Sequence, residues 1–535
     1  GYVGLTGSAK VIDTYAGSIR IIEGYTLNSD IDISGELLID ATLNLNGKTF
    51  NVGKNVNVNS YLHVRNGRLN CKGDFYANYY SEIYMQNEKD ILNVEGTFTF
   101  SNLRYSCDFS NGTLIIGGNC NVNGGDFRAT AAHKTIFNGE QKQIINVTNT
   151  YASFGKIIFN NTSEDGIEVK NSFNYAELVN ESGCKVIFAN GGTVGETLSA
   201  DKVVDGDYIL AMGELDLNGH TLTINGDFIQ AGGEVKINSG KLVVNGNYRI
   251  QTKKATEDGK ESYDYSTGIL NMTNESDVVE VSGDFVMGST KSHDGKLSAG
   301  TLTVGGNFTQ LSYNARNNFV ASGSHKVIFT SEKDHAISFD SSRSGESHFA
   351  NLTFEDDSKI TLKNDSYKRV TVTGSLTGTG CEISGYIDLA GAAKVVNKYK
   401  GNIRISEGYT LNSDISISGN FSAESYLYLN GKQLSTDGNV TISSYIGIQS
   451  GTLNCKGNLV VNYYSGRINM DNSSGVIDVE GNFVFNGGDY TSYLTKGKLY
   501  IAGDCTINYS TFNSNTDNEI IFDGTEKQVI NVTNS

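Results

Sequence analysis

Apolar and polar residues alternate along this chain on both sides of a recurring Gly-Asn or Gly-Asp pair. Examples are LNCKGDFYA (69–77) and IDVEGNFVF (477–485), in which apolar residues occupy every second position before and after the pair. Alternation with a period of two is typical of strands with one buried face. The pattern therefore predicts two short strands that meet at a corner, and glycine suits that corner because it accepts a positive φ. The corner glycines are Gly73, Gly96, Gly118, Gly226, Gly246, Gly283, Gly306, Gly438, Gly457, Gly481 and Gly503.

These corners recur mostly every 19 to 24 residues, which favours one fold class. In a parallel β-solenoid each coil stacks on a similar coil, so the same corner must return at nearly constant spacing. A β-hairpin also uses such corners but does not require that recurrence. We expect an all-β, elongated parallel β-solenoid (β-helix) of stacked coils of about 19 to 24 residues. A string of β-sandwich domains is the alternative.

A longer repeat organises the coils into modules. The octapeptide GYTLNSDI occurs at 24–31 and again at 408–415, and shorter matches halfway between them give a period of about 192 residues. We predict a first module at 1–192, a second at 193–384 and a truncated third at 385–535. The second module has one coil fewer, and it contains an inserted polar loop at 253–266. We expect the chain to be part of a longer array of such modules.

Composition excludes several classes of partner. The chain has 535 residues, no proline and a formal net charge of −17. The absence of proline is consistent with coils whose backbone N–H groups pair with neighbouring coils. The negative charge argues against nucleic acid, whose phosphates would be repelled. No apolar run approaches the roughly 18 residues of a membrane span, so we expect none in this segment.

Several strings resemble the long repetitive surface proteins of gut Firmicutes and similar bacteria. They are GTLTVGGNFT (300–309), HKTIFNGEQKQII (133–145) and EIIFDGTEKQVI (519–530). The resemblance covers nearly the whole chain, but it rests on a repeated sequence pattern and not on an active-site motif. It implies an extracellular, cell-surface β-solenoid that serves as a stalk or adhesin. Its partners would then be further repeats of the same chain, or host or bacterial surface glycans or proteins.

Polysaccharide cleavage is the enzymatic alternative, because right-handed parallel β-helices also carry lyases and hydrolases. No histidine is shared by all modules together with paired aspartates, so we expect no catalytic, cofactor-binding or metal-binding residues. Each histidine is interpreted as a solvated or strand-face residue. The insert at 253–266 is where a single active site would be sought first. Structural calcium is not expected, since no tandem calcium-binding nonapeptide occurs.

The cysteines follow the strand register. Cys71 and Cys455 occupy a position that valine takes in LVVNGNYRI (242–250), and Cys120 and Cys505 occupy a phenylalanine position. Buried thiols behave as small apolar groups. We therefore expect all seven cysteines to be reduced and mostly buried.

Tyrosines supply the one recurring candidate for binding. Tyr61 and Tyr80 lie 19 residues apart, or one coil, so they are expected to stack. Stacked tyrosines can form an external ledge for sugar rings or an internal ladder that fills the solenoid. The sequence thus predicts a non-catalytic extracellular repeat rod, with glycan binding on tyrosine ledges as the alternative. The candidate ledge residues are Tyr61, Tyr79, Tyr80, Tyr445, Tyr463 and Tyr464.

Overall fold

The computed structural model describes most of the chain. The described residues are 1–7, 9–11, 14–101, 107–124, 127–149, 152–171, 173–189, 191–254, 261–312, 316–330, 334–340, 345–355, 359–363, 368–378, 382–462, 465–487, 491–508 and 511–533.

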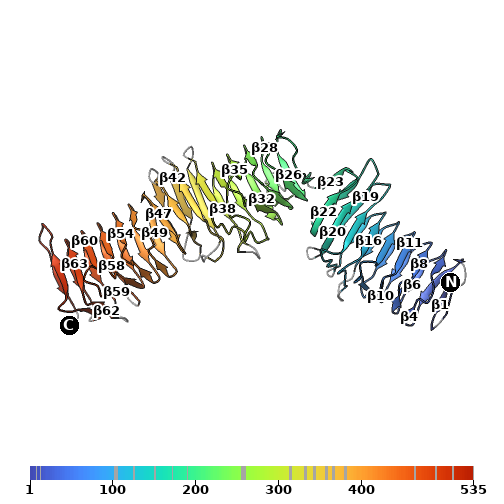
Figure 1. Cartoon of the computed structure of the whole chain (residues 1–535), viewed down its shortest axis with the longest axis horizontal. Helices are drawn as coiled ribbons and strands as arrows, with labels where there is room; N and C mark the ends of the chain where they lie inside the picture. The colour runs from blue at the N-terminus through green and yellow to red at the C-terminus, as the bar shows by residue number, and fades with distance from the viewer. Residues whose placement is uncertain are drawn as a thin grey trace.

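The molecule is an elongated all-β solenoid whose short strands stack along one long axis (Figure 1). Its sheets are parallel, with about 23 turns and coils about 21 residues apart. The predicted fold class is therefore confirmed. No helix among the described residues is long and apolar enough to cross a membrane.

Each turn contributes one strand to each of up to three sheets. The sheet before the corner runs from β2 (Thr14–Tyr15) to β22 (Asn174–Asn180), from β25 (Lys202–Val204) to β47 (Lys394–Val396), and from β48 (Lys398–Tyr399) to β66 (Asn518–Phe522). The sheet after the corner runs from β1 (Tyr2–Leu5) to β23 (Val186–Phe188), from β24 (Thr193–Val194) to β45 (Glu382–Ser384), and from β43 (Val370–Val372) to β67 (Ile530–Val532). The third sheet runs from β4 (Tyr25–Thr26) to β13 (Glu82–Tyr84), from β27 (Glu214–Asp216) to β34 (Ile269–Asn271), and from β50 (Tyr409–Thr410) to β65 (Phe512–Ser514).

The corner glycines are needed for a reason other than the predicted one. None of them has a φ in the left-handed region, so the expectation of a positive φ is wrong. A Cβ added to Gly246 would instead lie 2.4 Å from Oδ1 of Asp227 and 2.6 Å from the carbonyl oxygen of Gly226 in the previous coil. Any larger residue would therefore push successive coils apart, because real Cβ atoms do not approach other atoms this closely.

An Asn or Asp at the corner, in most coils directly after the corner glycine, bonds one coil to the next. Its side-chain Oδ1 accepts a hydrogen bond from the backbone N–H of the equivalent residue one coil later, at 2.7–2.9 Å. The backbone N–H at the corner is thereby satisfied by a side-chain oxygen and needs no backbone carbonyl from a neighbouring strand. The acceptors of this corner ladder include Asn55, Asp207, Asp227, Asn247, Asp284, Asn402, Asn420, Asn439, Asn458 and Asn482.

The corner ladder gives a first prediction. Replacing Asn458 by leucine should lower the free energy of unfolding by about 0.5–1 kcal/mol, because the backbone N–H of the exposed residue Asn482 loses its acceptor in the protein. Urea denaturation followed by circular dichroism measures this loss. Asn458→Asp is the matched control and should have little effect, since aspartate is the ladder acceptor at Asp227 and Asp284. Equal losses in both variants would contradict the hydrogen-bond explanation.

Buried apolar side chains fill the interior in two clusters. One extends from Leu5 to Phe188 and also includes Ala211 and Met212, and the other extends from Leu198 to Cys505. Phenylalanine rings stack along the axis within each cluster, for example Phe285 on Phe308 at a centroid distance of 5.4 Å. The two clusters therefore meet near residues 189–214, where the interior is not continuous.

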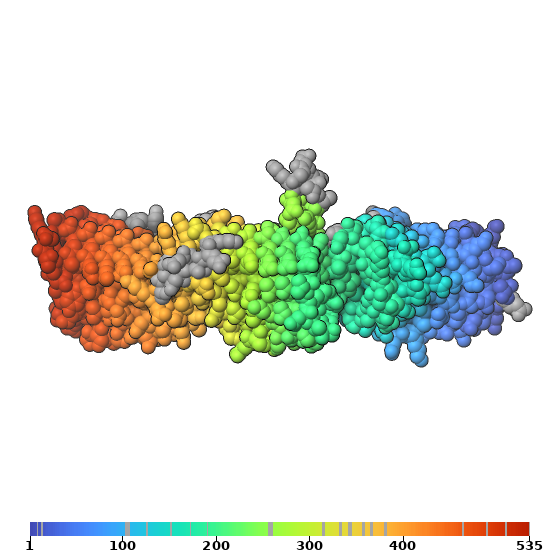
Figure 2. Space-filling view, turned by 90° about the horizontal axis from the view of Figure 1, so that it is seen from above, coloured from blue at the N-terminus to red at the C-terminus, as the bar shows by residue number. Residues whose placement is uncertain are grey.

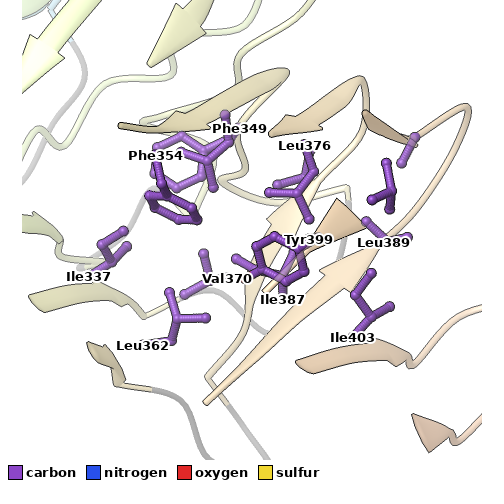
Figure 3. Packing of buried hydrophobic residues seen from close by; sticks show 14 of the residues in the cluster. Ile337, Phe349, Phe354, Leu362, Val370, Leu376, Ile387, Leu389, Tyr399 and Ile403 are labelled. Atoms are coloured by element: carbon purple, nitrogen blue, oxygen red, sulfur yellow. The ribbon is translucent and has the colours of Figure 1, made fainter. Parts of the chain in front are cut away.

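The sheets are interrupted at two junctions. At the first, β22 and β23 end their sheets and β24 and β25 begin new ones, and the rod bends there (Figure 1). At the second, near residues 370–399, the sheets also change but the core runs through without a break (Figure 3). A buried ion pair between Arg404 and Asp388, with Nη2 and Oδ2 2.7 Å apart, lies beside this second junction. The module boundaries at 192 and 384 remain predictions.

The predicted insert forms a hairpin on the side of the rod. β32 (Tyr248–Lys253) pairs antiparallel with β33 (Tyr263–Tyr265), and the hairpin stands out from the surface in Figure 2. The Arg249 guanidinium lies 4.8 Å from the centre of the Tyr263 ring. Within 253–266, residues 255–260 lie outside the described part of the chain.

Candidate functional site

The candidate tyrosines of the first module lie on the third sheet, but their register differs from the predicted one. Tyr61 begins β10 (Tyr61–His63), and its partner in the next coil is Glu82, 21 residues later. Tyr79 and Tyr80 lie in the turn before β13, with ring centroids 4.8 Å apart at 79°. All three tyrosines are exposed. The expectation that Tyr80 follows Tyr61 in register by one coil is therefore wrong.

A second aromatic contact lies beside Tyr61. The rings of His63 and Tyr84 stack with their centroids 4.5 Å apart and their planes 12° apart. The Tyr84 hydroxyl donates a hydrogen bond to the Glu82 carboxylate, and this bond raises the pKa of Tyr84 well above its usual value. The first-module face thus combines aromatic rings with a carboxylate.

The third module presents a larger cluster of rings at the equivalent place. Tyr445 begins β56 (Tyr445–Gly447), and its ring centroid lies 5.8 Å from that of Tyr426 and 5.3 Å from that of Tyr428. The Arg467 guanidinium carbon lies 5.1 Å from the centre of the Tyr445 ring on the other side of the stack. These four residues are named the tyrosine platform. Tyr463 and Tyr464, which are also predicted ledge residues, lie outside the described residues.

Neighbouring polar groups complete the tyrosine platform. The Asn469 side-chain amide donates a hydrogen bond to the Tyr445 hydroxyl at 3.2 Å. Partial burial raises the pKa of Tyr445, so its hydroxyl remains protonated at neutral pH. Tyr493, the register partner of Asn469 in the following coil, is 54% exposed. The face therefore offers apolar ring surfaces next to hydrogen-bonding groups, which is the combination that amphipathic ligands require.

Tyr426 and Tyr428 are not among the residues predicted from the sequence, although the sequence contains a signal for Tyr426. Tyr426 precedes Tyr445 by 19 residues, the same spacing that separates Tyr445 from the predicted candidate Tyr464. The coil after Tyr445 is longer, because Tyr445 pairs with Arg467, 22 residues later. A constant spacing of 19 therefore identifies the preceding partner correctly and misplaces the following one.

Five histidines are buried, and three of them, His133, His293 and His325, also lie outside the strands, so they are neither solvated nor on a strand face as expected. His133 and His325 lie in the turns before β18 (Lys134–Phe137) and β39 (Lys326–Phe329), and His293 is also fully buried. Neither ring nitrogen of His325 has a hydrogen-bond partner among the described residues.

Acid should therefore destabilise the fold through these histidines. Burial lowers the pKa of each of the three to about 4 from an ordinary value of 6.5. Because the unfolded chain binds protons that the folded state excludes, their contribution is complete above pH 6.5 and is lost as the pH falls towards 4. Replacing His325 by leucine should reduce the loss of stability between pH 7 and 4.5 by about 2–3 kcal/mol. Urea midpoints at the two pH values test this, and an unchanged pH dependence would contradict it.

The described cysteines agree with the register prediction at the four assigned positions. Cys71 and Cys455 end strands before a corner, Cys120 and Cys505 begin strands after one, and all four are buried. Cys107 is buried, Cys184 is half-buried, and Cys381 lies outside the described residues.

We expect seven titratable thiols after denaturation without a reductant. Before denaturation the reaction should be slow, because burial raises the pKa of Cys71 to about 12 and that of Cys455 to about 11, and the thiolate is the reactive form. Thiol titration at pH 8 before and after adding urea measures both quantities. Fewer than seven thiols in urea would show that a disulfide exists.

The described residues contain no group of three or more His, Cys, Asp and Glu side chains that could hold a metal ion. The chemistry that the site can perform is thus carried by aromatic rings and hydrogen-bonding side chains on an exposed sheet. No family model matches the chain, and neither the curated proteins nor the solved structures compared with it show significant similarity.

Proposed function

We propose that this chain is a non-catalytic, extracellular repeat rod of a larger bacterial surface protein, and that it acts as a stalk or adhesin segment. The observation that supports this function best is the repeated use of one coil pattern, in which successive coils are joined by the corner ladder. Such stacking adds length without a new core for each increment. The net charge of −17 suits a solvated surface.

A length-matched replacement tests the stalk. An unrelated β-solenoid of equal length should carry a terminal binding domain to the same distance from a cell surface and should preserve attachment. Antibody access to an epitope at the far end measures the distance, and counting adherent cells measures attachment. Loss of attachment with normal epitope access would show that this chain contributes contacts of its own, and the stalk proposal would fail.

Glycan binding is the second candidate, and the tyrosine platform is the observation that favours it. Tyr426 is 50% exposed, and its ring adjoins that of Tyr445, which packs against the Arg467 guanidinium. Exposed tyrosine rings stack on sugar rings while their hydroxyls and neighbouring amides bond to sugar hydroxyls. The equivalent face of the first module carries the stacked His63–Tyr84 pair in place of the tyrosine platform.

A glycan array with defined variants tests this candidate. The double variant Tyr426→Ala with Tyr445→Ala should lose glycan binding by a factor of about 10 or more, since each lost stacking contact weakens affinity. Tyr61→Ala is the matched control in the first module and should retain binding. No binding by the unmodified chain, or equal loss in both variants, would rule out the tyrosine platform as the site.

A further inference from the structure

Three turns at the same position of the coil contain an exposed Asn-Gly pair. The pairs are Asn46-Gly47, Asn218-Gly219 and Asn430-Gly431, and each connects a strand of the third sheet to a strand of the sheet before the corner. Both residues of every pair have a positive φ, between 48° and 80°. This is the geometry of a type I′ turn, which favours Asn-Gly. The three turns therefore share their backbone conformation and their access to water.

The turns of the first and third modules also share their sequence. Residues 45–48 and residues 429–432 both read Leu-Asn-Gly-Lys. In each turn the lysine N–H donates a hydrogen bond to the leucine carbonyl oxygen, at 3.0 and 2.9 Å respectively. The asparagine Nδ2 of each turn donates to a backbone carbonyl oxygen of the preceding coil, at 3.3 and 3.4 Å. A difference in reactivity between these two turns must therefore come from other contacts.

One hydrogen bond distinguishes the third turn from the other two. The Gly47 N–H donates to the carbonyl oxygen of Arg65 in the next coil at 2.9 Å, and the Gly219 N–H donates in the same way to Asn238 at 3.0 Å. Among the described residues, the Gly431 N–H has no hydrogen-bond partner. The backbone nitrogen of Gly431 is thus open to solvent, whereas its two counterparts are bound to the next coil.

A side chain holds the third turn in place of that bond. The backbone N–H of Asn430 donates to Oε1 of Gln449 at 3.0 Å, so the next coil binds the residue before the glycine. Gly431 itself has no side chain that could hinder an approach of its nitrogen to the neighbouring Asn430 side chain.

We propose that Asn430 is a site of spontaneous deamidation, and that the fold suppresses the same reaction at Asn46 and Asn218. The Gly431 N–H gives its proton to water and its nitrogen attacks Cγ of Asn430. The Cγ–Nδ2 bond breaks as the side-chain nitrogen takes up a proton and leaves as ammonia. Water then opens the succinimide ring at either carbonyl and gives aspartate or isoaspartate. An N–H that is bound to a carbonyl oxygen must first lose that bond, which slows the attack.

Deamidation changes a contact between coils beside the tyrosine platform. It replaces the Nδ2 group, which donates to the carbonyl oxygen of Leu411, with a carboxylate oxygen that cannot donate. Isoaspartate also lengthens the backbone of the turn that follows β53 (Leu427–Tyr428), the strand that carries Tyr428. The reaction therefore weakens the attachment of this turn to the preceding coil.

Incubation of the intact 535-residue chain at mildly alkaline pH tests the proposal. Peptide mass mapping over time measures the conversion at each of the three asparagines, and chromatography separates the aspartate and isoaspartate products. We expect Asn430 to convert faster than Asn46 and Asn218 by a factor of about 3 or more, because the bound N–H groups must be released before each attack.

The identical tetrapeptides provide the control. In urea the coils are lost, and Asn46 and Asn430 should convert at nearly the same rate because their leucine, glycine and lysine neighbours are the same. A difference that persists in urea would mean that the sequence and not the fold sets the rate, and the proposal would fail. Equal rates at these two asparagines in the folded chain, or conversion in urea but at neither of them in the folded chain, would also overturn it.

Discussion

Replacing Phe308 by alanine is expected to lower the free energy of unfolding by about 3–5 kcal/mol. The ring is fully buried and stands at the centre of an aromatic cluster. Its centroid lies 5.4 Å from that of Phe285, 5.3 Å from Phe339, and 5.0 Å from both Phe319 and Phe349. Several coils therefore lose contacts at once, and the rigid stacked walls cannot collapse to fill the cavity.

Urea denaturation followed by circular dichroism measures the effect. Ile22→Ala is the matched control, because Ile22 is 52% exposed and its truncation should change stability by no more than about 0.5 kcal/mol. The loss should be confined to the second core cluster, which contains Phe308. A change below about 1 kcal/mol would show that the ring is not packed as described.

Removing a whole number of modules should shorten the rod and preserve its fold. Joining Ala9 directly to Lys394 deletes 384 residues, which is twice the repeat period of about 192. With coils about 21 residues apart and about 4.8 Å of rise per coil, the rod should become roughly 85 Å shorter. Small-angle scattering measures the maximum dimension of the particle.

The register explains why this deletion should fold. In the intact chain Tyr2 of β1 pairs with Ser18, and Tyr386 of β46 (Tyr386–Leu389) pairs with Asn402. After the deletion β1 takes the place of β46 against β49 (Asn402–Ile405), with Leu5 at the buried position of Leu389. Each coil keeps a neighbouring coil with the same pattern of strands and corners, and a linear stack requires only such neighbours.

An out-of-phase deletion is the control for the module prediction. Joining Ala9 to Arg404 removes ten further residues, about half a coil, so that corners no longer lie above corners. Because β-strand side chains alternate and the corners pack closely, this chain should misfold or aggregate. If both deletions folded equally well, the repeat period would not be the unit of length. If neither folded, the modules would not be interchangeable.

The sequence by itself determined the coil and its interior. Period-two alternation identifies the inward side chains, so Leu69, Cys71 and Phe75 were assigned correctly to the core. The constant corner spacing required like coils to stack on like coils, and this gave the parallel solenoid. Both properties are local or periodic, so they can be recovered without knowing which coil lies above another.

Only the tertiary structure decided the contacts between coils. The corner glycines serve the close approach of Gly226 to Gly246 and not a positive φ, because the obstacle belongs to another coil. Tyr445 lies opposite Arg467 because the coil that follows it has 22 residues and not 19, which shifts the register. The first junction likewise exists because no strand pairing joins β22 to β25. Such features depend on how separate coils are placed, and the local pattern of apolar residues does not encode that placement.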